Sequence, residues 1–155
     1  MKMFRITLIA LLAMSLHVMG VSGNSNIPVN ELTTEWQLGQ EIDGVMIYFK
    51  RVECHDVNNG IFKENILVKM VNTTERALRL EWDMEFWYDG ECRTCDPAVD
   101  TEYHYVVNLK AGDVVEGTCA VDSSRELKYY IRFLNYPHVA KLSDYQLANL
   151  RVSPN

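Results

Sequence analysis

The stretch ALRLEWDMEFWYD, residues 77–89, alternates between two kinds of side chain along most of its length. One set of alternate positions is apolar or aromatic and the other is mostly charged: Leu78, Leu80, Trp82, Met84, Phe86 and Tyr88 against Arg79, Glu81, Asp83, Glu85 and Trp87. A period of two over about eleven residues predicts a long β-strand with one buried face. No stripe of comparable quality with the helical period of 3.6 follows the first 23 residues, which favours an all-β protein.

Other segments rich in β-branched and aromatic residues recur at short intervals. They are residues 43–54, 65–71, 102–110, 113–121, 126–134 and 145–152. Turn-forming residues such as Asn59-Gly60 separate them. About seven short strands with frequent turns predict a single immunoglobulin-like antiparallel β-sandwich, and a small closed barrel is the alternative.

The first 23 residues have the layout of a secretory signal peptide. Lys2 and Arg5 precede a short apolar run, and small residues follow it. The run is too short to span a bilayer, and no later segment is apolar enough to do so. We therefore expect a signal peptide over residues 1–23, an N-terminal arm or edge strand over 24–40 and a β-sandwich domain over 41–155. A secreted or periplasmic protein of the cell envelope follows from this layout.

The charge argues against nucleic acid as a partner. The chain has 15 basic and 21 acidic residues, and removal of Lys2 and Arg5 leaves 13 basic residues, a net charge of about −8 (13 − 21). An acidic surface repels phosphate backbones.

All four cysteines, Cys54, Cys92, Cys95 and Cys119, follow the predicted signal peptide. If successive strands run up and down, all four fall at one end of the sandwich. An exported protein favours two structural disulfides. The sequence leaves the pairing open. We favour bonds from Cys54 and from Cys119 to the 92–95 loop, because a self-closed pair would not anchor that loop.

Two alternatives use the same cysteines for chemistry. C-x-x-C is a common half of a zinc site, but Cys54 and Cys119 lack close-spaced partners. A redox pair needs a helix N-terminus or nearby cations, whereas acidic residues flank Cys92 and Cys95. Calcium could bind the acidic residues of the same loop, although their spacing matches no EF-hand. We expect no cofactor.

Three further groups of residues are candidates for function. Glu81, Asp83 and Glu85 form a row of carboxylates, but any alternating strand produces such rows on its solvated face. We therefore expect no catalytic residues and no enzymatic activity. Trp36 and Trp87 are candidates for an interaction surface, because exposed aromatic residues are common in interfaces. Asn72 begins an N-T-T glycosylation sequon.

Several segments, taken in order, resemble a group of small exported bacterial proteins without assigned function. They are DGVMIYFKRVEC, NILVKMVNTTERALRLEW, the C-x-x-C loop, VNLKAGDVVEGTC and YQLANLRV. In that group an immunoglobulin-like sandwich carries one cysteine after its first main strand and another after a Lys-x-Gly-Asp turn. The resemblance covers about residues 44–152 and implies an envelope location without a known activity. We expect a binding or structural module whose partner is another envelope protein or a glycan.

Overall fold

The computed structural model describes residues 26–96 and 101–155, and the regular structure in that range consists of β-strands and short 3₁₀ turns. Every strand pairing is antiparallel. The expected all-β class is therefore confirmed, whereas the expected signal peptide lies outside the described residues. Within the described ranges, no helix is long and apolar enough to cross a membrane.

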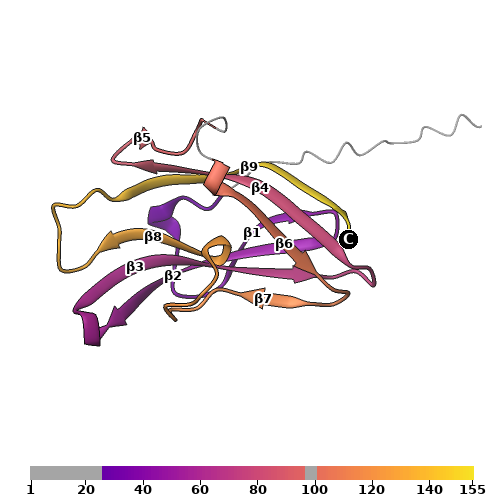
Figure 1. Ribbon diagram of the computed structural model, residues 1–155, viewed down its shortest axis with the longest axis horizontal. Helices are drawn as coiled ribbons and strands as arrows, with labels where there is room; N and C mark the ends of the chain where they lie inside the picture. The colour runs from indigo at the N-terminus through magenta and orange to yellow at the C-terminus, as the bar shows by residue number, and fades with distance from the viewer. Residues whose placement is uncertain (1–25, 97–100) are drawn as a thin grey trace, which may run out of the picture.

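The strands form two sheets, which we call sheet A and sheet B (Figure 1). Sheet A contains β1 (Gln37–Ile42), β2 (Val45–Asp56), β3 (Ile61–Asn72), β7 (Val114–Glu116) and β8 (Lys128–Phe133). Its order is β1-β2-β3. β7 and β8 both pair with β3, each with a different part of that strand. Sheet B contains β4 (Leu78–Tyr88), β5 (Glu91–Cys92), β6 (His104–Leu109) and β9 (Leu142–Pro154), with β4 paired to the other three.

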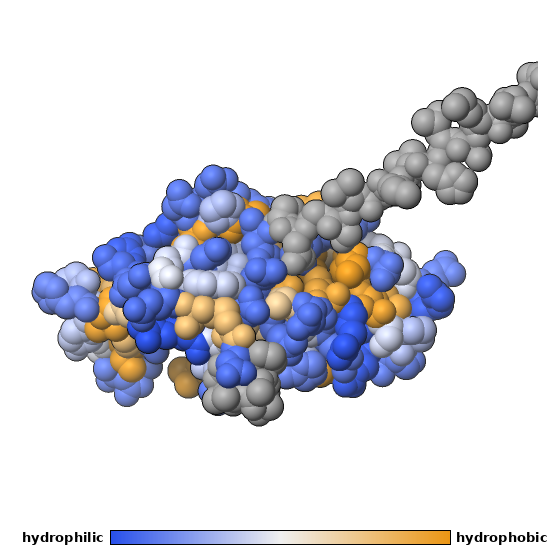
Figure 2. Space-filling model, turned by 90° about the horizontal axis from the view of Figure 1, so that it is seen from above, coloured by the Kyte–Doolittle hydropathy of each residue, from blue (hydrophilic) through white to orange (hydrophobic). Residues whose placement is uncertain are grey.

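The two sheets share one hydrophobic core. The apolar face of β4 is buried as the alternation predicts, and Trp82 is only 1% exposed. Aromatic rings meet edge to face between the sheets, with centroids 5.5 Å apart for Phe49 and Tyr145 and 5.4 Å apart for Phe86 and Tyr129. Such contacts add to the stabilisation from apolar burial. The opposite side of sheet B is a mostly hydrophilic surface on which hydrophobic residues form separate patches (Figure 2).

Two Asp-Gly turns set strand boundaries. Asp43 and Gly44 have φ of 46° and 84°, and Asp89 and Gly90 have φ of 51° and 85°. Positive φ at both central residues suits the tightest β-hairpins, and Asp-Gly is a preferred sequence there. The first turn joins β1 to β2, so the strand expected to begin at residue 43 begins at Val45 and has a separate strand before it.

The segment after β7 crosses the outer face of sheet A. Cys119 in this segment is bonded to Cys54 of β2, and the carbonyl of Ala120 accepts a hydrogen bond from Nζ of Lys128 in β8 at 2.6 Å. β2 and β8 lie on opposite sides of β3, so the segment spans that strand. The alternation of β3 points Leu67 outward, yet Leu67 is only 4% exposed. This burial agrees with the segment after β7 covering it.

The N-terminal arm packs against both sheets. Val29 in the 3₁₀ turn η1 (Val29–Glu31) and Leu32 belong to the core. Asn26 donates a hydrogen bond to the carbonyl of Tyr145 in β9 at 2.7 Å and accepts one from Gln40 in β1 at 3.0 Å. The arm thus joins the edge strands β1 and β9, and β1 crosses the expected boundary between an arm over 24–40 and a domain over 41–155.

Candidate functional site: a tyrosine-lined cleft

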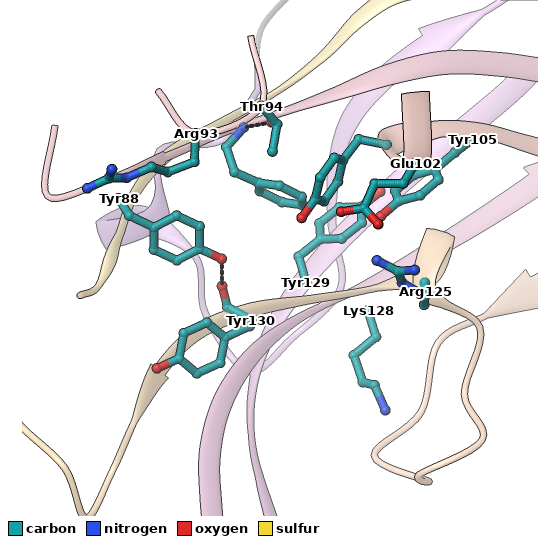
Figure 3. Close-up of a pocket in the computed structure, with 11 residues that line it drawn as sticks. Tyr88, Arg93, Thr94, Glu102, Tyr105, Arg125, Lys128, Tyr129 and Tyr130 are labelled. Carbon is teal, nitrogen blue, oxygen red and sulfur yellow. Dashed lines mark hydrogen bonds between the residues drawn. The ribbon is translucent and has the colours of Figure 1, made fainter. Parts of the chain in front are cut away.

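A half-open cleft of about 370 Å³ lies between the sheets on the side of β6 and β8 (Figure 3). The residues that line it come from both sheets and from the turns η3 (Thr101–Tyr103) and η4 (Arg125–Leu127): Phe86, Tyr88, Arg93, Thr94, Glu102, Tyr103, Tyr105, Arg125, Lys128, Tyr129 and Tyr130. Five of them are tyrosines. A concave site with aromatic walls and a few polar groups is the usual form of a small-molecule site.

Strand periodicity places the aromatic residues. Phe86 and Tyr88 are alternate residues at the end of β4, so both project toward sheet A. Tyr129 of β8 is 1% exposed and forms the floor, where its ring meets that of Phe86. The hydroxyl of Tyr88 donates a hydrogen bond to the carbonyl of Tyr130 at 3.0 Å and so connects the two sheets (Figure 3).

The Cys92–Cys95 disulfide closes a small loop beside the cleft. Cys92 belongs to β5, which pairs with the end of β4. Thr94 lies inside the loop and is buried. Its hydroxyl accepts a hydrogen bond from the amide of Phe86 at 2.9 Å and donates one to the carbonyl of Met84 at 2.8 Å. The loop is therefore fixed to the edge of β4 by a side chain as well as by the backbone.

Burial raises the pKa of four of the cleft tyrosines, so their hydroxyl groups stay neutral. It raises the pKa of Tyr105 to about 12 and raises the pKa values of Tyr88 and Tyr129. Burial also raises the pKa of Tyr130. Neutral hydroxyl groups can both donate and accept hydrogen bonds, which suits them to polar, uncharged ligand groups.

Three cations and one carboxylate stand around the aromatic residues. Arg93 projects from the disulfide loop and pairs with Glu91 at 2.8 Å. The charge of Arg125 lowers the pKa of Tyr105 and the charge of Glu102 raises it, so both side chains lie near the Tyr105 hydroxyl. Lys128 completes the set, and its pKa is lowered by burial and by the charge of Lys63. The ammonium group of Lys128 points away from the tyrosines to the carbonyl of Ala120, and Arg93 is paired with Glu91, so the charged pair beside the tyrosines is Arg125 with Glu102 (Figure 3).

The cysteine pairing differs from the one we favoured. Cys54 is bonded to Cys119, and Cys92 to Cys95, so the two disulfides are separate and lie on different sheets. The expectation that a self-closed pair would leave the loop loose was wrong, because Thr94 and the β4–β5 pairing anchor it. In the described residues no group of three or more His, Cys, Asp or Glu side chains is arranged to hold a metal ion.

The carboxylate row of β4 lies outside the cleft. Glu81 is held by Arg79 at 2.7 Å and Arg151 at 3.0 Å. Asp83 accepts a hydrogen bond from Asn149 at 2.8 Å and pairs with His104 at 2.8 Å. These hydrogen bonds lower the pKa values of both carboxylates.

Glu85 differs from the other two, because burial and the charge of Asp83 raise its pKa. None of the three carboxylates lines the cleft. Glu81 and Asp83 are therefore ion-paired on the sheet face, whereas the surroundings of Glu85 disfavour its charged form.

The two tryptophans proposed for an interaction surface do not form one surface. Trp36 precedes β1 and lies against the outer face of sheet A, where Nζ of Lys50 and of Lys69 are 4.3 and 4.8 Å from its ring centroid. Trp87 lies in sheet B on the charged side of β4 and pairs with Cys92. Both are half-buried. A contact role for either residue stays a prediction.

Asn72 of the sequon is the last residue of β3 and is buried, 1% exposed. Its amide nitrogen donates hydrogen bonds to the carbonyls of Arg76 at 2.7 Å and Lys110 at 2.8 Å. Its oxygen accepts one from the amide of Thr74 at 2.9 Å. The nitrogen that a glycan would modify is thus occupied in the folded protein.

Sequence reasoning missed most of the cleft. The expected interaction residues were Trp36 and Trp87, and none of the residues that line the cleft was among them. A signal was present for Arg93, which is the only basic residue between Cys92 and Cys95 and must project from the loop that they close.

Comparison with known proteins adds no assignment. No protein-family model matches the chain, and neither the curated proteins nor the solved structures gave a match. The resemblance to exported bacterial sandwich proteins therefore stays a prediction.

Proposed function

We propose that the chain is an exported carbohydrate-binding module with an immunoglobulin-like sandwich, and that the tyrosine cleft holds the sugar. The observation that carries the proposal is the composition of the cleft wall, where six aromatic rings stand beside Arg93, Arg125, Lys128 and Glu102. The two disulfides support export, because such bonds persist in oxidising compartments.

The chemistry of a sugar matches this wall. A pyranose ring has a face of C–H groups, which packs on aromatic rings, and a rim of hydroxyl groups, which needs donors and acceptors. The hydroxyls of Tyr88 and Tyr129 already donate to backbone carbonyls and supply acceptors, and Arg125 and Glu102 supply charge-assisted hydrogen bonds.

The volume of the cleft also suits a sugar ligand. About 370 Å³ is at the lower end of the range for small-molecule sites, and it suits the terminal units of a glycan. A folded partner protein needs a broad contact area instead, about 800 Å² on each side.

A second candidate ligand is an extended peptide of another envelope protein. Among the described residues, β6 pairs only with β4 and β8 only with β3, so each keeps an open edge, and both strands border the cleft. Open edges accept an added strand. Binding of a peptide with no binding of any sugar would favour this candidate.

The proposal is tested by applying the mature protein to a glycan array and measuring the affinity for the best-bound glycan by calorimetry. Tyr103→Ala and Arg125→Ala should each weaken binding about tenfold or more, because each removes a ring or a charged donor from the wall. Tyr136→Ala and Arg76→Ala are matched controls, since both residues are exposed and outside the cleft, and they should leave the affinity unchanged. Equal affinity in all four variants would exclude the cleft as the site.

A further inference from the structure

A second cavity lies between the arm, β2, β8 and the start of β9. It has a volume of about 400 Å³. Three of the residues that line it are cations, namely Arg51, Arg132 and Lys141, and none is acidic. An unbalanced cluster of this kind is unexpected on a chain with 21 acidic and 15 basic residues.

A buried carboxylate fixes two of these cations. Glu64 of β3 has a side chain only 6% exposed, and its two oxygens lie 2.5 Å from Nε of Arg51 and 2.6 Å from Nε of Arg132. Burial alone would raise the pKa of Glu64, but the hydrogen bonds from Arg51 and Arg132 together outweigh it and lower the pKa. The carboxylate is therefore ionised and holds both guanidinium groups in place.

The arginines keep their other donors for a ligand. Each uses Nε toward Glu64, and in the described part of the chain no residue hydrogen-bonds their terminal nitrogens. Arg51, Arg132 and Glu64 together carry a net charge of +1, Glu53 acts on Arg51 by its charge without a hydrogen bond to it, and the arginines are held before a ligand arrives. Terminal guanidinium nitrogens bind a planar carboxylate in pairs, which is the strongest form of this contact.

The rest of the cavity is partly apolar. Val29, Ile131 and Leu142 line it, and all three are buried members of the core. Lys141 is exposed at the cavity, and its backbone amide, not its side chain, bonds to Asp89 at 3.2 Å. The cavity thus joins a cationic side to an apolar side.

We propose that this cavity binds a small organic acid whose carboxylate meets Arg51 and Arg132. The hydrocarbon part of the acid lies on the apolar side, and Lys141 adds attraction at the entrance. The site is separate from the tyrosine cleft, so either proposal can fail without the other.

The test is a titration of the isotope-labelled protein with hexanoate, followed by two-dimensional NMR. Hexanoate should shift the backbone amide signals of Asn30, Lys141 and Ser143, which belong to the cavity. Hexanamide, which has the same shape without the charge, should not shift them. Equal shifts with hexanamide or with inorganic sulfate, or no shift with hexanoate, would overturn the proposal.

Variants locate the binding in the cavity. Arg132→Ala should weaken hexanoate binding about tenfold or more, since it removes one charged donor pair. Lys141→Ala should weaken it severalfold without a risk to folding, because that side chain is exposed. Arg79→Ala is the matched control: Glu81 is also held by two arginines, but on the open face of sheet B. Unchanged affinity in the folded cavity variants, or a loss in Arg79→Ala, would contradict the assignment.

Discussion

Glu64 and Glu85 are two carboxylates whose surroundings shift their pKa values in opposite directions. Glu64 has a folded pKa below its unfolded value, so its ionised form stabilises the fold above the unfolded pKa, and that contribution is lost as the pH falls through the folded pKa. Glu85 has a raised folded pKa, so its ionised form opposes folding at neutral pH, and the penalty disappears in acid.

We predict that Glu64→Gln lowers the free energy of unfolding by about 2–3 kcal/mol at neutral pH. This is less than the cost for a wholly buried pair, because Arg51 and Arg132 are 30% and 37% exposed. Glu85→Gln should give a small gain at the same pH. Urea unfolding of both variants from neutral to acidic pH measures the effects, and both differences should shrink as the pH falls. A loss for Glu64→Gln that grows in acid would contradict the account.

Asn72 is the residue on which two turns depend, because its side chain bonds to Arg76, Lys110 and Thr74. Asn72→Ala should lower the free energy of unfolding by about 2–4 kcal/mol, since it removes several buried hydrogen bonds and leaves their partners unpaired. Asn108→Ala, an exposed asparagine of β6, is the control and should cost less than about 0.5 kcal/mol. Equal effects of the two changes in denaturant unfolding would show that Asn72 has no such role.

At the scale of elements, the two disulfides close loops of very different length. The bonded cysteines are 65 residues apart for Cys54 and Cys119 but 3 apart for Cys92 and Cys95. In the chain-entropy model, replacing the first pair by serine should cost about 4 kcal/mol and replacing the second about 2 kcal/mol or less. Thermal unfolding of the two double variants measures this order. A larger loss for the Cys92–Cys95 pair would mean that its loop stabilises the fold in another way.

The strands were predictable where one face is buried along the whole element. β4 follows the alternation of residues 78–88 closely, because its apolar face meets the core and its charged face does not. The boundary at Asp43-Gly44 was missed although Asp-Gly is a hairpin signal. The short strands β5 and β7 have too few residues to show a period, and their positions follow from pairing with β4 and β3.

The cysteine pairing and the cleft depend on how whole elements are placed. The local sequence does not show that the segment after β7 crosses β3 to reach Cys54. Nor does it show that residues of β4, β6, β8 and two 3₁₀ turns converge between the sheets. The periodicity of a strand says which side a residue faces, but not which strand lies opposite.

At the scale of the molecule, the two sheets divide the surface into parts with different chemistry. The outer face of sheet B carries the paired charges of β4, whereas the outer face of sheet A carries Trp36 with its two lysines. The tyrosine cleft and the arginine cavity both lie between the sheets, in concave places that a small ligand can enter.

The central claim is that a glycan binds in the tyrosine cleft, and the side-chain signals of the tyrosines test it most directly. The chain has eight tyrosines, of which five line the cleft and three, Tyr48, Tyr136 and Tyr145, do not. Aromatic ¹H–¹³C spectra of tyrosine-labelled protein should be recorded while the best-bound glycan of the array is added. We predict that the shifts are confined to the cleft tyrosines. Shifts at Tyr48 or Tyr136 with the cleft signals unchanged would contradict the claim.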